Sequence, residues 1–89
     1  MSYDYQALRE QVFTDEGQRM YIQLRDHTRD LMSKAGCAQL CKMIEPLTGD
    51  SWLMLACVDR MVELLDIDCV YTGHATQFNI YVPTRKFIP

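Results

Sequence analysis

Residues 50–65, DSWLMLACVDRMVELL, decide the fold of this chain. Apolar side chains recur in this stretch at i, i+3, i+4 and i+7, which is the spacing of one helical face. Asp50 is a typical N-cap residue, and its carboxylate complements the positive end of a helix dipole. We therefore predict a helix that begins at Asp50, runs to Leu65 and is covered by other elements from several directions.

The predicted helix leaves only a narrow arc uncovered. Its apolar stripe consists of Met54, Leu55, Val58, Met61, Val62 and Leu65, widened by Leu53, Cys57 and Leu64. The remaining arc consists of Trp52, Ala56, Asp59, Arg60 and Glu63. We expect this arc to be the part of the helix that is left for solvent or a ligand.

The period of the sequence changes after this helix. Between Ile67 and Val82, apolar and polar residues alternate with period two, and Gly73 and His74 interrupt the alternation. Alternation on both sides of a turn is typical of an antiparallel hairpin. Because a lone two-stranded hairpin is marginal in water, we expect a helix to cover its apolar side.

Three segments that precede residue 50 also carry helical patterns. Residues 17–35 show one apolar face, Thr14 is a suitable N-cap and Gly36 a suitable stop. Residues 3–13 are expected to form a short N-terminal helix or arm, and residues 37–44 a two-turn helix. The chain is thus predicted to be mainly helical up to the hairpin.

Length and composition describe a single globular domain, residues 1–89. Of its 89 residues, 48% are hydrophobic and 24% are charged, which excludes a largely disordered chain. A domain of this size lies near the lower end of self-sufficient stability, so the apolar surface of the arm 3–13 and of residues 87–88 in the C-terminal tail 83–89 is a candidate for a homodimer contact. No stretch approaches the roughly 18 uninterrupted apolar residues of a membrane span, so we expect a cytoplasmic protein without a membrane contact.

The formal net charge is −3. Proteins that bind phosphate backbones usually carry a basic face or a high isoelectric point. The charge therefore disfavours nucleic-acid binding, unless the nine basic residues gather on one side of the fold.

The four cysteines do not form a recognisable metal-binding pattern. Cys37 and Cys41 are one helical turn apart, and Cys69 or His74 would be the further ligands of a metal site. Each cysteine, however, falls in or beside an apolar pattern, and free cysteine is among the most buried residue types. We therefore predict buried thiols, and neither a metal nor another cofactor.

The sequence contains none of the common catalytic motifs. It has no Gly-x-Ser-x-Gly, no phosphate-cradling glycine loop and no His-Glu-x-x-His. Its two histidines lie in different predicted elements, without an obvious nucleophile beside them. We expect a protein that is not an enzyme.

The order helix, short helix, turn, longer helix and hairpin resembles that of the winged helix-turn-helix superfamily of bacterial and phage regulators. Residues 58–67, VDRMVELLDI, are similar to the end of the recognition helix and the first wing strand in that family. There an aliphatic-x-Arg-Leu-x-x-Leu-Gly-x-Ile pattern leads into the wing. The resemblance covers roughly residues 17–82. The chain departs from the family pattern in two places. Leu65 stands where the pattern has glycine, so we expect the chain to leave the helix by another route. The wing tip, residues 72–76, contains no Lys or Arg.

The resemblance implies an α+β fold, a mainly helical winged helix-turn-helix domain with a C-terminal two-stranded β-hairpin. It also implies double-stranded DNA as the partner of a transcriptional regulator, with the N-terminal residues of the recognition helix toward base edges in the major groove. The residues expected by position to contact bases or sugars are Ser51, Trp52, Ala56 and Arg60, and those expected near phosphates are Thr48, Lys42, Arg25 and Arg29. Arg60 would read guanine bidentately, while the neighbouring Asp59 and Glu63 would repel phosphates.

A second hypothesis is that the same fold mediates protein–protein contacts, as an adaptor, an inhibitor or a phage-type accessory protein that does not bind DNA. The acidic balance, the uncharged wing and exposed apolar residues such as Ile22 and Trp52 favour it. Both hypotheses require the arc of the helix 50–65 to be free, because a cover formed by the protein's own chain would remove the contact surface.

Overall fold

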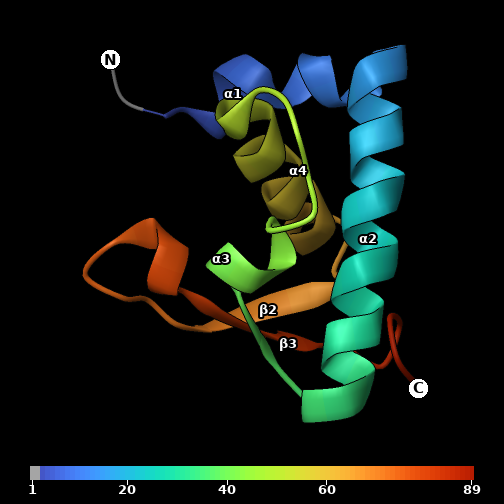
Figure 1. Ribbon diagram of the computed structural model, residues 1–89, viewed down its shortest axis with the longest axis vertical. Coiled ribbons are helices and arrows are strands. Elements are labelled where there is room, and N and C mark those ends of the chain that lie inside the picture. Colours follow the sequence, from blue (N-terminus) through green and yellow to red (C-terminus); the bar gives the residue numbers. More distant parts are fainter. Residues whose placement is uncertain (1–2) are drawn as a thin grey trace.

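The chain folds into helices that stand on one small antiparallel sheet, as the computed structural model of residues 3–89 shows (Figure 1). The helices are α1 (Tyr5–Leu8), α2 (Asp15–Ala35), α3 (Leu40–Met43) and α4 (Ser51–Glu63), and the 3-10 turns are η1 (Arg9–Phe13) and η2 (Thr76–Phe78). The strands are β1 (Ala38–Gln39), β2 (Ile67–Tyr71) and β3 (Ile80–Pro83). The predicted α+β class with a mainly helical chain is confirmed. Within residues 3–89, no helix has the length and apolar character that a membrane crossing requires.

The sheet has three strands where the sequence predicted two. Its order is β1-β3-β2, and both pairings are antiparallel. Ala38 lies opposite Tyr81 and Gln39 opposite Ile80, so the predicted helix 37–44 is wrong over its first residues. A strand of two residues is too short to show a period, and only its partner far along the chain makes it a strand.

The pairing predicted between the two halves of residues 67–82 is present, with a later second strand. β2 and β3 pair from Ile67 opposite Pro83 to Tyr71 opposite Ile80, and the register is irregular between Cys69 and Tyr71. The second strand begins at Ile80, because the residues before it form the turn η2. We call residues 67–83, which include both strands and their connection, the β2–β3 arm.

The helix α4 begins as predicted and is deeply buried. The Asp50 side chain accepts a hydrogen bond from the backbone N–H of Trp52 at 2.9 Å. The buried residues of α4 are Leu53, Met54, Ala56, Cys57, Val58 and Met61. Figure 1 shows α2 on one side of α4, α1 across its upper end and the strands below, and α4 contacts α2, α1 and the strand β2.

The chain leaves the helix α4 through Leu65, whose backbone is in the left-handed region with φ 63°. The prediction that the chain exits the helix by another route because glycine is missing is therefore wrong. The prediction that Leu65 belongs to the buried stripe is also wrong, since 66% of this residue is exposed. Two side chains of the C-terminal tail hold this turn. The Thr84 hydroxyl donates to the Leu65 carbonyl at 2.6 Å, and the Lys86 ammonium donates to the Leu64 carbonyl at 2.6 Å.

The helix α2 has the bounds and the buried face that the sequence predicted. The Thr14 hydroxyl caps it by accepting from the Gly17 N–H at 3.1 Å, and Gly36 ends it with φ 77°. A Cβ at Gly17 would lie 2.1 Å from the Gln11 carbonyl oxygen, so glycine there allows η1 to cross the start of α2. The buried residues of α2 are Gly17, Met20, Tyr21, Leu24, Thr28 and Met32.

Replacing Leu65 by glycine is expected to raise the free energy of unfolding by roughly 0.5–1 kcal/mol. A left-handed conformation costs an L-residue about 1–2 kcal/mol, and glycine loses about 0.5–1 kcal/mol more backbone entropy on folding. Leu65→Ala retains the strain and is expected to stay within about 0.5 kcal/mol of the parent. Denaturant unfolding measures both variants, and a glycine variant no more stable than the parent would contradict strain at this residue.

Thr28 is fully buried, and its hydroxyl has no hydrogen-bond partner among residues 3–89. A buried unpaired polar group costs about 1–3 kcal/mol, so Thr28→Val, which keeps the shape, is expected to stabilise the fold by about 1 kcal/mol. Thr28→Ser keeps the hydroxyl and loses a methyl group, and it is expected to destabilise by about 1 kcal/mol. Thermal unfolding compares the two, and a destabilised valine variant would show that the hydroxyl is bonded.

Candidate functional site

The arc of α4 that the sequence assigned to solvent or a ligand is covered by residues 3–13. Both α1 and η1 contact α4 (Figure 1). The Tyr3 hydroxyl donates to Asp59 at 2.5 Å, and the Tyr5 hydroxyl donates to Glu63 at 2.8 Å. The expectation of a free arc is therefore wrong, because the N-terminal segment packs on it, and neither the DNA-binding nor the protein-contact hypothesis stands in the form that uses this arc.

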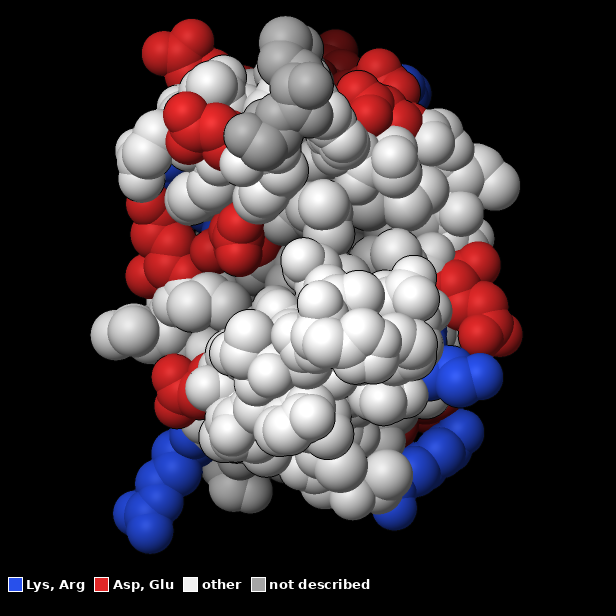
Figure 2. Space-filling model, turned by 90° about the vertical axis from the view of Figure 1, so that its left-hand side faces the viewer, with Lys and Arg blue, Asp and Glu red and all other residues white. Residues whose placement is uncertain are grey.

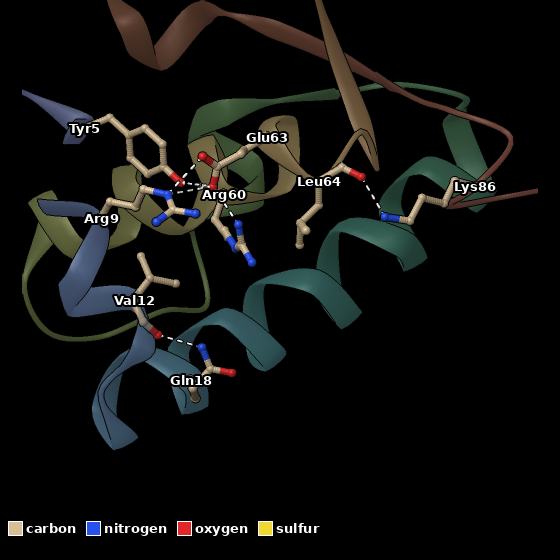
Figure 3. Close-up of polar contacts among 8 residues, drawn as sticks. All are labelled: Tyr5, Arg9, Val12, Gln18, Arg60, Glu63, Leu64 and Lys86. Atoms are coloured by element: carbon tan, nitrogen blue, oxygen red, sulfur yellow. Dashed lines mark hydrogen bonds and ion pairs between the residues drawn. The ribbon is translucent and has the colours of Figure 1, made fainter.

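Glu63 is the centre of this contact. Its carboxylate accepts hydrogen bonds from Arg9 Nε at 2.9 and 3.0 Å and from Arg60 Nη1 at 2.6 Å, in addition to the Tyr5 hydroxyl (Figure 3). The hydrogen bonds from Arg9, then those from Arg60 and Tyr5, lower the pKa of Glu63 to about 2. Glu63 therefore joins η1 to α4 as an ionised carboxylate.

Arg60 is engaged in the same contact. Its guanidinium carbon lies 4.9 Å from the centre of the Phe13 ring, while that of Arg9 lies 5.3 Å from the same ring. Arg60 is also bound to Glu63, and only 21% of its side chain is exposed. A guanine reader must present its donor edge to the groove, so this arrangement does not support the predicted role of Arg60.

The other residues predicted on α4 have different surroundings. Ala56 is fully buried, so its predicted contact with a base or sugar is wrong. Its position outside the apolar stripe gave no sign of this burial. Trp52 is half-buried, whereas Ser51 and, in the preceding loop, Thr48 are exposed.

Apart from Thr48, the residues predicted near phosphates lie on two helices and contact other side chains of the chain. Lys42 in α3 pairs with Glu45 at 3.5 Å, and its carbonyl oxygen lies 3.0 Å from His27 Nε2. Arg25 in α2 pairs with Asp26 at 3.2 Å. Arg29, one turn later, lies 4.6 Å from the centre of the ring of Phe87, so it faces the C-terminal tail. Phe87 itself is buried, so this part of the tail packs on the protein's own fold.

The β2–β3 arm presents apolar side chains that sequence reasoning missed. The predicted alternation placed Tyr71 inward with Ile67, but only Ile67 is buried, and Val70 and Tyr71 are 60% and 55% exposed. No Asp, Glu, Lys or Arg occurs in residues 69–84. Figure 2, which views the side from which the arm projects in Figure 1, shows a broad uncharged surface with charged residues at its margins.

Contacts within the connection between the strands order the tip of the arm. The Gly73 N–H donates to the Asn79 side-chain oxygen at 3.0 Å, and the rings of His74 and Phe78 lie 5.0 Å apart. A Cβ at Gly73 would lie 2.7 Å from the Cβ of Phe78, so glycine lets the chain close on itself there. These contacts order the tip although none of its residues is buried, and an ordered tip reduces the ordering cost of a contact.

The thiols only partly match the predicted burial. Cys57 is buried, and burial raises the pKa of its thiol to about 12. Cys41 is half-buried, but Cys37 and Cys69 are exposed, so the prediction of buried thiols is wrong for these two. Over residues 3–89, no three metal-binding side chains are close enough together to hold a metal ion.

One open cavity of about 220 Å³ lies where α2, β1 and α3 meet. It is lined by Leu31, Ala35, Cys37, Ala38, Gln39 and Lys42. The cavity is smaller than the range of about 300–1,000 Å³ that is typical of small-molecule sites. Its lining holds no carboxylate and no histidine, so it contains no acid–base pair of the usual kind.

Comparison of this chain with protein-family models, with curated proteins and with solved structures found no match. No residue role can therefore be transferred from a relative. The two regions whose geometry invites a functional interpretation are the seam between residues 3–13 and α4, and the exposed β2–β3 arm.

The seam predicts a pH dependence of stability. Because the folded-state pKa of Glu63 is lowered from 4.5 to about 2, its ionised form stabilises the fold above pH 4.5, and this contribution is lost as the pH falls toward 2. Glu63→Gln is expected to lower the thermal midpoint near neutral pH, by a difference that shrinks over that interval. Glu10→Gln, an exposed substitution in η1, is the control. A difference that stays constant with pH would contradict the assignment.

Proposed function

We propose that this protein is a small protein-interaction module of the winged-helix type, an adaptor or inhibitor, which binds a protein partner through the β2–β3 arm. The exposure of Val70 and Tyr71 on a projecting arm that carries no charged residue after Asp68 supports the proposal. Contiguous exposed apolar surface with a charged margin is typical of a binding site, and the centres of protein interfaces are poor in charge and rich in aromatic residues.

Two observations support the winged-helix assignment. The elements α2, α3, α4, β2 and β3 follow one another in the order helix, short helix, longer helix and paired strands. Leu65 adopts the left-handed conformation that the glycine of the family pattern would favour at this position.

The charges favour a protein partner over DNA. The wing tip lacks cations, and the arc of α4 that would enter a groove is occupied by residues 3–13. On that arc Arg60 is already neutralised by Glu63, and Asp59 adds a second acid. A DNA contact needs cations that replace counterions along the phosphates, and this side of the molecule offers few.

DNA binding is the second candidate, because Arg25, Arg29 and Lys86 remain on α2 and the adjoining tail. Non-specific DNA binders reach dissociation constants of about 10⁻⁴–10⁻⁶ M, so fluorescence anisotropy with random duplex at low salt detects them. We expect no binding at protein concentrations of roughly tens of micromolar, which lie within this range of dissociation constants. Binding that weakens steeply with salt would establish the second candidate instead.

The double substitution Val70→Thr and Tyr71→Thr is expected to abolish partner binding without loss of the fold. Both new residues are β-branched and suit a strand, while the apolar anchors are lost. Retention of a partner from nuclease-treated lysate measures the effect, and we expect at least about a tenfold loss of affinity. Ile22→Thr, at another exposed apolar residue, is the matched control. Unchanged retention by the double variant, or no protein retained by the parent, contradicts the proposal.

A further inference from the structure

The sheet has two edge strands of different length. The strand order β1-β3-β2 places β1 at one edge and β2 at the other. β1 has only two residues and continues directly into α3, whereas β2 has five. An edge strand presents backbone N–H and C=O groups that lack a partner within the sheet, so another strand can bind to it. The longer edge, that of β2, is therefore the place to look for such groups.

The register shows which backbone groups of β2 face this edge. The Thr84 N–H donates to the Asp66 carbonyl at 2.9 Å, which makes these two residues a hydrogen-bonded pair at the start of the ladder. Hydrogen-bonded and non-hydrogen-bonded pairs alternate in an antiparallel ladder. Asp68 therefore bonds to β3, while Ile67 and Cys69 point their N–H and C=O groups away from it.

Pro83 agrees with this assignment, but only part of the edge is open. Pro83 lies opposite Ile67, in a pair where β3 donates no hydrogen bond to β2, and proline has no N–H to donate. Ile67 is fully buried, so its backbone groups are not accessible, whereas residues 68–72 are all exposed. The open part of the edge thus begins at Cys69, whose N–H and C=O are bonded by no turn, loop or cap within residues 3–89.

The register irregularity after Cys69 brings apolar side chains to the same place. Cys69 lies opposite Tyr81 and Tyr71 opposite Ile80, so Val70 is the extra residue of a bulge. Val70 and Tyr71 are 60% and 55% exposed and follow Cys69 directly. A strand that pairs here gains apolar contacts in addition to hydrogen bonds. In strand addition the main-chain bonds give affinity, and the side-chain contacts give specificity.

Asp68 determines which charge fits this edge. It is exposed, and it is the one charged residue of the β2–β3 arm. No cation within residues 3–89 lies at ion-pair distance from it. Opposite charges on directly opposed residues stabilise paired strands, and like charges destabilise them. A partner strand with lysine or arginine opposite Asp68 is therefore favoured over one with an acidic residue there.

A second copy of this chain fits the edge less well. Antiparallel pairing of two β2 strands about Cys69 sets Asp68 of each copy opposite Val70 of the other, because the strands run in opposite directions from the central pair. Neither carboxylate then meets a cation. Bulges and charged residues are also features by which edge strands avoid pairing with their own kind.

We propose that the open edge of β2 receives an extended segment of the partner protein as a fourth strand of the sheet. This segment carries a lysine or arginine opposite Asp68 and an apolar side chain against Val70 and Tyr71. A helix does not fit the edge, because its own N–H and C=O groups are already paired. This binding mode rests on the proposed function, because it concerns the same arm.

The test is a titration of the ¹⁵N-labelled full chain with a synthetic peptide of about eight residues, a usual strand length. Threonine and valine alternate in the peptide, and one lysine replaces a central threonine. Saturable shifts are expected at the amides of Cys69, Val70 and Tyr71. Hydrogen exchange of the Cys69 amide, which faces the open edge, is expected to slow when the peptide binds, and that of Asp68, which bonds to β3, to change little.

Two N-methylated peptides are the matched controls. Methylation of every second nitrogen removes the N–H groups of one edge of the peptide strand, and methylation of the remaining nitrogens removes those of the other edge. One of the two peptides is expected to lose affinity at least about tenfold, and the other at most about threefold.

Reversal of charge tests the pair with Asp68. A peptide with glutamate in place of lysine is expected to bind the parent about fivefold more weakly, and Asp68→Lys is expected to restore its affinity. Glu10→Lys makes the same change of charge at an exposed residue of η1, and it is expected to leave the glutamate peptide weak.

Three results would overturn strand addition: no peptide binding, equal losses for the two N-methylated peptides, or no rescue of the glutamate peptide by Asp68→Lys. A partner that is still retained through Val70 and Tyr71 in that case leaves the proposed function in place. Unchanged partner retention by the double threonine variant overturns the proposed function, and strand addition with it. Slow exchange of the Cys69 amide that depends on protein concentration, without peptide, would overturn the proposal in favour of a second copy.

Discussion

The burial of α4 is the constraint on which the rest of the structure depends. Helices that are apolar around most of their circumference must be covered from several sides, and α4 contacts α2, β2 and the N-terminal elements α1 and η1 (Figure 1). Ala56, on the side expected to be open, has no exposed surface. Residues 3–13 are consequently a part of the fold, and Val12 at their end is fully buried in the core.

Covering the polar side of α4 required partners for its charged residues. Burial raises the pKa of Asp59, even though the hydrogen bond from Tyr3 opposes the shift. Glu63, one turn later, shifts in the opposite direction because Arg9, Arg60 and Tyr5 all donate to it. The arc of α4 is therefore the contact between residues 3–13 and the helix, and its polar residues stabilise the fold through bonds within the chain.

Because residues 3–13 cover the arc of α4, the apolar side chains that remain exposed lie at the C-terminal end of this helix and in the β2–β3 arm. The β2–β3 arm exposes Val70 and Tyr71, and the turn into β2 exposes Leu65. The arm has Asp68 as its one charged residue, and the turn lies beside the ion pair of Lys86 with Asp66. These surfaces are the basis on which we propose contacts with other proteins in preference to the reading of a DNA groove along α4.

The sequence by itself determined the elements whose signals are local. Thr14, Asp50 and Gly36 mark helix ends through bonds and dihedral angles within a few residues, and the apolar periods indicate the buried face of α2 and part of that of α4. The change to period two likewise predicted the strands that follow α4, but it did not predict the residue at which β3 begins.

Only the tertiary structure decided what depends on residues far apart in the chain. The strand β1 exists because Ala38 and Gln39 meet β3, and the arc of α4 is closed because residues 3–13 cross it. The register irregularity after Cys69 breaks the simple alternation of β2, so its period could not tell which residues face outward. The burial of a residue depends on the residues that pack against it, and these are often distant in sequence. A local pattern identifies the apolar face of a helix or strand but not the element that covers it.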